Sequence, residues 1–443
     1  MLNPKQFLHM DNLSLVMMGL IGFVAIFVAL FSFRYLKGDR KRNSFYGNFV
    51  AMLLSALLMV NADHLLFMLI SWEASNIFLV RLMLHKKEWS AARESSVLAL
   101  KNFGLGFAFL SGAFFILFSV TNETSIQVIA NTSIEKPWLF TSSFLILLAA
   151  MTQSALWPFH RWLTSSLNSP TPVSAIMHAG LVNGGGFLLA RFAPMLAEQA
   201  AILSIIFVVG VITALLGTLW KLMQSDIKRM LACSTMGQMG FMVAQCGLGL
   251  FPAAVAHLCW HGLFKAYLFL GSGSAAQEKS LDLDYPPSLK HFLMAAICGF
   301  VGAYLFAKTS DKNLLVGDTT LFLTTLTMIA GTQFALPIVR GVSVVKLPLA
   351  LFANAVAGSL YGLSVHLIES PLISLGISHP QPLNSLHIGA LIVLVASWLS
   401  VLFARNFRKR TFPDWVLKAY VHMLNISQPH PKTVTAHRNH YQF

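Results

Sequence analysis

Stretches of about twenty mostly apolar residues recur along the whole chain and constrain its fold more than any other feature. Of the 443 residues, 56% are hydrophobic and 11% charged, against roughly 25% charged residues in soluble domains. Because a helix needs about twenty apolar residues to cross a bilayer, the sequence predicts an all-α, polytopic membrane protein with about thirteen transmembrane helices. These predicted spans lie near residues 13–33, 45–62, 65–84, 97–120, 138–157, 172–197, 201–222, 229–249, 253–275, 291–308, 318–338, 347–369 and 386–404.

The basic residues are divided unevenly between the two sets of loops. One set, together with the C-terminal tail, holds twenty-three of the 31 Lys and Arg residues, and the other holds four. Since basic residues concentrate in cytoplasmic loops, the sequence predicts an N-terminus outside and a C-terminus in the cytoplasm. This placement explains the net charge of +14 without nucleic acid as a partner. Arg81 and Arg191 lie near span ends, where we expect them to snorkel to the interface.

The sequence divides into a transmembrane domain over residues 1–404 and a basic cytoplasmic tail over residues 405–443. The tail contains the run TFPDWVLKAYVHMLNISQ, whose aromatic and basic residues are typical of a short interfacial helix. The final HRNHYQF is polar, and we expect it to be extended and mobile. The four cysteines form no CxxC pair and are expected to be packing residues rather than metal ligands.

Residues 149–194 combine apolar length with features that interrupt a helix. Pro158 follows the polar Gln153, a Pro-Thr-Pro sequence precedes His178, and three consecutive glycines come after it. Proline breaks or kinks a helix, and broken backbone inside a membrane is tolerated only where protein or water satisfies the freed groups. The stretch therefore predicts discontinuous helices along an ion path. The alternative is a proline kink in a helix that only packs. Pro337 marks a second possible break.

Buried ionisable side chains supply the candidate path residues. His257, His261 and Lys265 recur at i, i+4 and i+8, so they share one helix face. Histidine titrates near neutral pH, and such a row joined by water could pass a proton. A zinc site is less favoured, since HEXXH is absent and the lysine opposes a cation. Glu73 is expected to be either protonated or paired with a cation, and Lys101 either snorkels or belongs to the path.

These motifs resemble the proton-translocating, antiporter-like membrane subunits of respiratory complex I, particularly the subunit 5/L branch, and of Mrp cation antiporters. The matching runs are WE at 72–73, SALWPFHRWL at 154–163, SPTPVSAIMHAG at 169–180, SDIKRMLACSTMGQMGF at 225–241 and AHLCWHGLFKAYLFLGSGS at 256–274. The resemblance implies an antiporter-like fold with paired half-paths joined by titratable residues and water.

The resemblance also assigns roles to individual residues. It implies a gating carboxylate at Glu73, a bridging histidine at His178, and a central relay formed by His257, His261 and Lys265.

The chain departs from the family pattern at three places. The lysine that normally partners the glutamate falls where this chain has Gln153. The acidic residue of the fourth span is missing, although Lys101 keeps a basic position there, and no obvious lysine occupies the region of Pro337. Coupled pumping as in complex I is therefore placed in doubt.

We expect the chain to lack the lateral helix that ends subunit L and the two helices that precede the position of Leu13 in that family. In this respect it is similar to the membrane subunits of Dab inorganic-carbon accumulation complexes. This resemblance implies a proton- or sodium-conducting subunit of a bacterial inner membrane that is not itself an enzyme. It implies no cofactor in this chain, and a large soluble DabA-like zinc protein, similar to β-carbonic anhydrases, docked at the cytoplasmic face. The alternatives are a component of an NADH:quinone oxidoreductase, an Mrp-type cation/proton antiporter, or a structural scaffold.

Overall fold

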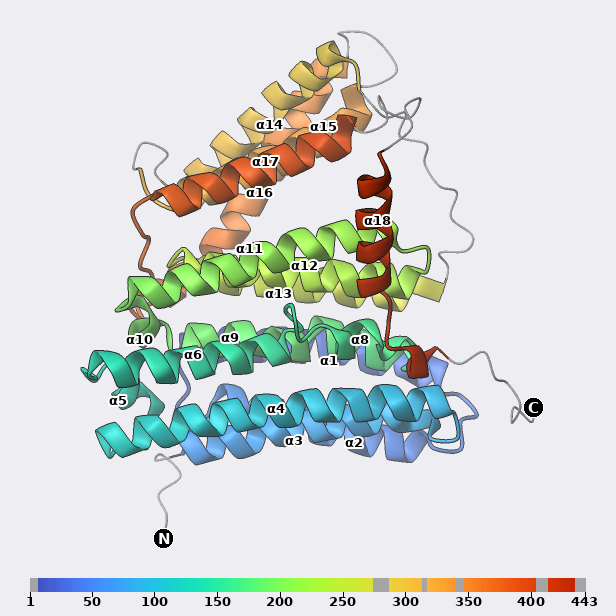
Figure 1. Ribbon diagram of the computed structural model, residues 1–443, viewed down its shortest axis with the longest axis vertical. Helices are drawn as coiled ribbons and strands as arrows, with labels where there is room; N and C mark the ends of the chain where they lie inside the picture. The colour runs from blue at the N-terminus through green and yellow to red at the C-terminus, as the bar shows by residue number, and fades with distance from the viewer. Residues whose placement is uncertain (1–6, 274–286, 313–316, 340–345, 404–412, 435–443) are drawn as a thin grey trace. The chain divides into compact units, whose positions relative to one another are not determined.

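The computed structural model describes residues 7–273, 287–312, 317–339, 346–403 and 413–434 (Figure 1). These residues form helices joined by loops, with four isolated β-bridges and no strand among them. The predicted all-α fold is therefore confirmed. Within the described residues, 11 helices are long and apolar enough to cross a membrane.

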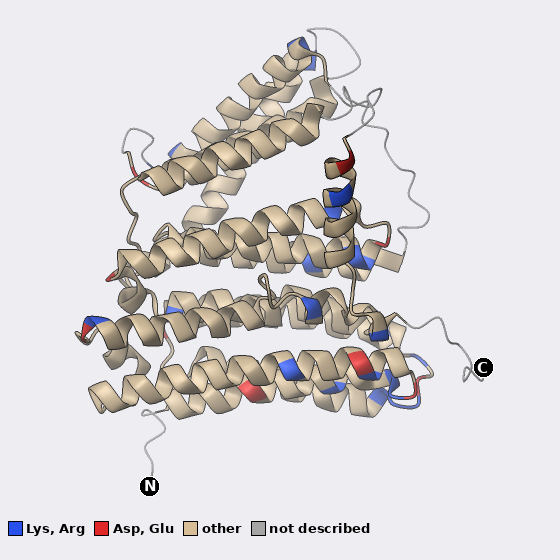
Figure 2. Cartoon of the chain, viewed as in Figure 1, with Lys and Arg blue, Asp and Glu red and all other residues tan. Residues whose placement is uncertain are grey.

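All thirteen predicted spans correspond to helical segments. The two that fall outside the 11 are α6 (Lys136–Gln153) and α12 (Ile227–Gly247), which are long enough to span but less apolar. Charged residues lie mostly at helix ends and in loops (Figure 2). The chain is thus a multi-pass membrane protein.

The chain forms two compact units, of which the first comprises Met1–Gly247, Ala254–Gln277 and Tyr420–Phe443. Its long helices, besides α6 and α12, are α1 (Asn12–Tyr35), α2 (Arg42–Val60), α3 (Leu65–Met83), α4 (Ser90–Thr121), α11 (Ala200–Met223) and α13 (Phe251–Leu270). Short helices between them are η2 (Leu84–Lys86), α5 (Ile126–Ala130), α7 (Arg161–Thr164), η3 (Ser166–Asn168) and α10 (Ala193–Ala197). The long helices run side by side in this unit (Figure 1).

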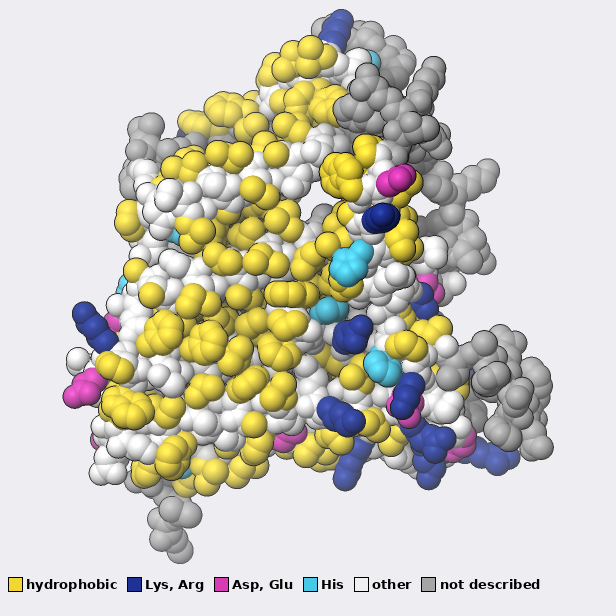
Figure 3. All heavy atoms as spheres, viewed as in Figure 1, with side chains coloured by type: hydrophobic (Ala, Val, Ile, Leu, Met, Phe, Trp, Pro, Cys, Tyr) yellow, Lys and Arg dark blue, Asp and Glu magenta, His cyan; other side chains and the backbone are white. Residues whose placement is uncertain are grey.

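The outer faces of these helices carry large apolar side chains. Phe115 is 72% exposed and Leu30 is 65% exposed, and hydrophobic atoms cover most of the visible face over α4 and α6 (Figure 3). Contiguous apolar surface of this kind is unfavourable in water. It suits contact with lipid acyl chains.

A discontinuous helix occupies the centre of the first unit. It consists of α8 (Thr171–Ala179), the 3-10 turn η4 (Leu181–Asn183) and α9 (Gly184–Arg191). In its 18-residue apolar window, 94% of the residues are buried. Its polar side chains therefore face other helices of the unit rather than lipid.

Arg191 at the end of α9 forms a buried ion pair with Asp11, the residue that caps α1. Its guanidinium also donates to Ser14 Oγ at 2.9 Å and to the Val60 carbonyl at 3.0 Å. The expectation that Arg191 snorkels to the interface is therefore wrong, because a carboxylate inside the protein supplies its counter-charge. Arg81 is exposed, with its guanidinium 5.6 Å from the centre of the Phe78 ring.

The described C-terminal residues comprise the helix α18 (Asp414–Ile426) and the short η8 (Pro431–Thr433). The segment from Tyr420 onward belongs to the first unit and packs within it through polar contacts. Four hydrogen bonds hold this segment against the ends of other helices, and they join Gln224 to Ser427, Arg229 to Gln428, Asn168 to the Thr433 carbonyl, and the His430 amide to Ser165. The terminal HRNHYQF lies outside the described residues, and the interfacial position of α18 stays a prediction.

The second unit comprises Leu248–Ala253 and Glu278–Ala419. Its helices are α14 (Leu289–Thr309), α15 (Thr320–Val339), α16 (Leu347–Ile373) and α17 (Ser385–Phe403). Lys312 and Glu369 form a buried ion pair with an N–O distance of 2.9 Å. Pro337 lies within α15, whose described part continues to Val339. The helix is therefore not interrupted at Pro337 itself, and residues 340–345, which follow it, lie outside the described residues.

The Asp11–Arg191 pair generates a prediction for stability. Burial raises the pKa of the Asp11 carboxyl, but the Arg191 charge and hydrogen bonds from Ser14 outweigh it and hold this pKa below 3.8. Because the pKa is lower in the folded state, the pair stabilises the protein fully above about pH 4 and loses this contribution as pH falls through the folded pKa. Asp11→Asn leaves a buried guanidinium unpaired, so we expect a loss of about 3 kcal/mol at pH 7.

Thermal unfolding in detergent from pH 8 to pH 3 measures this effect. The difference in Tm between wild type and Asp11→Asn should be constant down to pH 5 and shrink below about pH 4. Glu123→Gln, which removes an exposed carboxylate, is the control and should change stability by less than about 0.5 kcal/mol. A difference that does not respond to acid would contradict the assigned pair.

The packing of α11 against α12 generates a second prediction. A Cβ atom added to Gly240 would lie 2.4 Å from the Ala214 amide nitrogen and 2.8 Å from the Gly210 carbonyl. These are backbone atoms that cannot rotate away, so Gly240→Ala should cost about 1–3 kcal/mol. Gly104→Ala meets nothing within 4 Å and should stabilise α4 by up to about 1 kcal/mol. Equal melting temperatures for the two variants would refute this packing.

Candidate functional site

The break between α8 and α9 leaves carbonyl groups that other elements satisfy. Gln153, at the end of α6, donates from Nε2 to the Leu181 carbonyl at 3.2 Å. Its neighbour Ser154 donates from Oγ to the Val182 carbonyl at 2.6 Å. Backbone groups inside a membrane must find partners within the protein or in water. The polar end of α6 thus makes the η4 turn possible.

Glycine permits this close approach. A Cβ atom on Gly185 would lie 2.3 Å from Ser154 Oγ and 2.4 Å from the Ala150 carbonyl. The glycine run that follows His178 therefore lets α9 and the end of α6 pack with their backbones in contact.

His178 sits on α8 and is almost fully buried, with 2% of its surface exposed. Its Nδ1 atom lies 3.1 Å from Thr235 Oγ1 on α12. Its ring stacks on Phe269 of α13 with centroids 4.2 Å apart. Thr235 Oγ1 donates in turn to the Leu231 carbonyl at 3.0 Å. With that hydroxyl hydrogen committed, Thr235 accepts a hydrogen bond from Nδ1 of His178.

Lys265 on α13 reaches the same carbonyl. It is 0% exposed, and its Nζ atom donates to the Leu231 carbonyl at 3.4 Å. No carboxylate of the described residues lies within ion-pair distance of it. The Leu231 carbonyl thus holds the Lys265 ammonium and the Thr235 hydroxyl beside one another and links both to His178.

The other two residues of the predicted row also lie on α13. His261 is buried, and its Nδ1 atom lies 3.3 Å from Asn183 Oδ1 in the η4 turn. The His257 ring stacks on that of His261 with centroids 6.4 Å apart. Nε2 of each histidine is buried without a hydrogen-bond partner among the described side chains and backbone. Water is the ordinary partner of such buried atoms.

Glu73 belongs to a second group of polar side chains. It is half-buried on α3, and its buried Oε2 atom has no hydrogen-bond partner within the described part of the chain. Asn76 lies one turn further along α3 and accepts a hydrogen bond at 3.0 Å from Gln153 Nε2. The site expected for a lysine therefore carries a neutral amide network, and no described cation pairs with Glu73.

The η4 turn connects the two groups. Gln153 donates to the carbonyl of Leu181, and His261 contacts the side chain of Asn183, two residues later. The structure therefore brings Gln153, His178, His261 and Lys265 around one break in the backbone.

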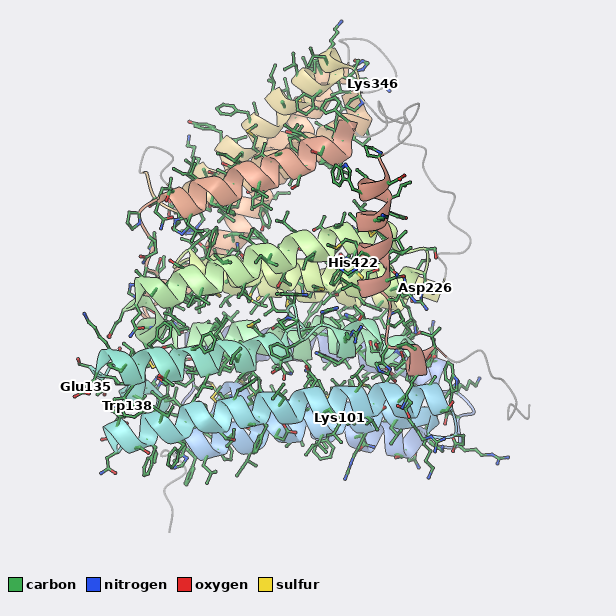
Figure 4. The ribbon with its side chains drawn as sticks, viewed as in Figure 1. Lys101, Glu135, Trp138, Asp226, Lys346 and His422 are labelled. Atoms are coloured by element: carbon green, nitrogen blue, oxygen red, sulfur yellow. The ribbon has the colours of Figure 1, made fainter. Side chains whose placement is uncertain are left out.

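Lys101 is placed differently from the other candidates. Its side chain is exposed on the surface of α4 (Figure 4). Its neighbour Asn102 instead points inward and donates to the Thr152 carbonyl at 2.9 Å, at the end of α6. Lys101 therefore does not contact the buried network around the α8–α9 break, and its position at the membrane interface stays a prediction.

Sequence reasoning missed four neutral members of this network, which are Asn76, Asn102, Asn183 and Thr235. Three of them flank residues that were singled out, since Asn76 follows Glu73 by one turn, Asn102 follows Lys101, and Asn183 precedes the glycine run. Amides within apolar spans were the available signal.

Two known protein families match parts of the chain. Residues 62–295 match the family described as NADH:quinone oxidoreductase/Mrp antiporter, TM. Residues 4–46 match the family described as NADH-Ubiquinone oxidoreductase (complex I), chain 5 N-terminus. The chain therefore belongs to the antiporter-like subunit 5/L family of membrane proteins, as its motifs predicted.

Individual relatives refine this assignment. The chain is 39% identical over 279 residues to the probable inorganic carbon transporter subunit DabB1 of Halothiobacillus neapolitanus, covering 61% of this chain and 50% of that protein. It is 34% identical over 276 residues to NADH-quinone oxidoreductase subunit L of Pseudomonas aeruginosa, covering 60% and 44% respectively. The chain thus spans about half the length of the relatives it matches.

A solved structure shares the fold. The Mrp complex from Dietzia sp. contains a chain that superposes with a TM-score of 0.60 and 22% identity, covering 97% of this chain and 53% of that one. The likeness supports the predicted antiporter-like architecture.

The link between His178 and Lys265 generates a prediction. Thr235→Val keeps the shape of the side chain but removes the hydroxyl that bonds both His178 and the Leu231 carbonyl, whereas Thr235→Ser retains it. If ions pass through this link, cation flux into proteoliposomes should fall at least about tenfold in the valine variant, equivalent to about 1.4 kcal/mol on the barrier. The serine variant should stay within about twofold of wild type.

Elution volume and Tm of both variants report whether the fold is kept. Wild-type flux in a folded Thr235→Val protein would show that the path does not use this hydroxyl.

Proposed function

We propose that this chain conducts protons or sodium ions as the energy-coupling membrane subunit of an inorganic-carbon uptake complex. The observation that carries the proposal is the hydrogen-bonded connection between His178 and Lys265 in the core of the first unit. Buried ionisable groups are costly in a membrane and mark ion pathways. The name of the Halothiobacillus neapolitanus relative supports the inorganic-carbon assignment.

The proposed proton steps use side chains that both donate and accept. The Leu231 carbonyl accepts only, so it orients Lys265 and Thr235 but cannot carry a proton itself. For a proton to pass from His178 to Lys265, the Thr235 hydroxyl would have to turn from the Leu231 carbonyl toward Lys265 Nζ. It would then give its proton to a neutral Lys265 and take the Nδ1 proton of His178. The orphaned Nε2 atoms of His257 and His261 would extend the row along α13 through water.

Glu73 and Gln153 are proposed to act at the other side of the η4 turn. Glu73 would take up and release the cation, and the neutral amide of Gln153 would position Asn76 and the Leu181 carbonyl without adding charge. A buried glutamate without a lysine partner takes up a proton or binds a mobile cation more readily than a glutamate that is paired with a lysine. This difference from the family pattern favours conduction down a gradient over pumping.

Catalysis is proposed to lie in a different polypeptide. A large soluble DabA-like zinc protein at the cytoplasmic face would hydrate CO2, and the ion flow through this chain would drive that reaction in one direction. Among the described residues, no group of three or more His, Cys, Asp or Glu side chains could hold a metal ion. We also propose the orientation with the N-terminus outside and the C-terminus in the cytoplasm of a bacterial inner membrane.

Copurification tests the proposal against its alternative. An affinity-tagged chain isolated from its own membrane should bring down one large zinc-containing soluble protein. Copurification of a redox assembly would instead favour a component of an NADH:quinone oxidoreductase, an alternative that the similarity to subunit L supports. Copurification of other antiporter subunits would favour an Mrp-type antiporter. The proposal fails if no zinc protein copurifies and deletion leaves growth at low CO2 unchanged.

Two variants test the assigned residues. Lys265→Ala and Glu73→Gln should each abolish bicarbonate accumulation, because each removes an ionisable group that a neutral residue cannot replace. Both variants should still copurify with the partner. Lys136→Ala removes an exposed lysine of the same unit and should accumulate bicarbonate like wild type. Undiminished accumulation by either Lys265→Ala or Glu73→Gln would refute the role of that residue.

A further inference from the structure

A groove of about 560 Å³ lies between the end of α3 and the start of α4 in the first unit. Its lining includes Lys87 and Arg93 near the loop that joins the two helices. Val80, Val97 and Leu100 line it one or two turns further along the helices. The groove is thus basic toward the loop and apolar toward the middle of α4. Its volume lies within the usual range for ligand sites.

The length of α4 sets the depth of this groove in the membrane. The helix has 32 residues, about 48 Å at 1.5 Å per residue, whereas the hydrocarbon core is about 30 Å thick. The predicted span over residues 97–120 has an apolar length that matches this thickness, so Val97 and Leu100 lie inside the hydrocarbon at its edge. Arg93 lies one turn before that edge, at the level of the lipid headgroups.

The described acidic side chains near the groove form no ion pair with its basic groups, although the charge of Lys87 acts on its neighbour Glu88. Glu88 also lines the groove, but its Oε1 atom pairs with Lys41 Nζ at 2.5 Å. Glu94 lies about 100° around the helix from Arg93 and is not part of the lining. Within the described chain, Lys87 and Arg93 form no ion pair. Lys and Arg side chains also gather at this end of α4 (Figure 3).

We propose that this groove binds an anionic phospholipid. Its phosphodiester group would lie between Lys87 and Arg93, where Arg offers two parallel N–H donors and Lys a point charge. One acyl chain would cover Val97 and Leu100, each of which is 45% exposed. Lys101, about one turn inside the span, would reach the same headgroup layer with its long side chain. This site is separate from the buried network, so it stands or falls independently of the proposed function.

Native mass spectrometry of the full chain in detergent tests the site. With phosphatidylglycerol and phosphatidylethanolamine supplied at equal concentration, wild type should retain the anionic lipid preferentially. Lys87→Gln/Arg93→Gln should lower its apparent affinity about thirtyfold, at about 1 kcal/mol per basic residue. The control Lys37→Gln/Lys86→Gln removes two exposed charges at the same end of the unit that do not line the groove, and it should bind like wild type.

Additional measurements distinguish a bound phospholipid from free phosphate and from an acidic protein. A tenfold excess of inorganic phosphate should not displace the lipid, because phosphate lacks the acyl chain. Val97→Trp, which fills the apolar part and leaves the charges, should also weaken binding and serves if the double variant misfolds. Equal retention of the two lipids by wild type would overturn the proposal. The proposal would also be overturned if wild type bound an acidic protein that the double variant did not bind, while both bound phosphatidylglycerol equally.

Discussion

The break between α8 and α9 is the constraint on which the first unit depends. Two consecutive carbonyls, of Leu181 and Val182, are released inside a buried segment, and the end of α6 supplies a donor for each. Each unmatched group of this kind costs several kcal/mol in a membrane. The break therefore requires α6 to end at Gln153, and it requires glycine where α9 meets that end.

The sequence alone was sufficient to predict the helices and several of the positions at which they break. Apolar length located thirteen helical segments, of which 11 are long and apolar enough to cross a membrane in the described chain, since this signal depends only on composition over about twenty residues. The prolines and glycines around His178 located the break because they act on the local backbone. Pro337 does not interrupt α15, which continues through it to Val339 in the described part of the chain. Arg191 was misplaced because its counter-charge, Asp11, lies far away in the sequence.

The candidate site was predictable only in part, for a related reason. Helical spacing placed His257, His261 and Lys265 on one face, because that relation is local. Neither the contact of His178 with Thr235 nor the carbonyl that Thr235 shares with Lys265 could be inferred, since both join separate helices. Neutral side chains such as Asn183 give a weak signal in sequence, yet they satisfy much of the network. Hydropathy could not show whether Lys101 or Asn102 points into the protein. The rotation of α4 about its axis decides this, and it turns Asn102 inward.

The isolation of Lys265 has an electrical consequence. A protonated lysine paired with a buried carboxylate adds no net charge to the interior of the membrane. Lys265 has no such partner among the described residues. A unit charge that crosses the full membrane potential changes in energy by about 2.3 kcal/mol per 100 mV. If Lys265 takes up a proton from one side of the membrane, as the proposed function requires, net charge moves through part of that field. The protonated fraction of Lys265 then responds to voltage as well as to the proton concentration.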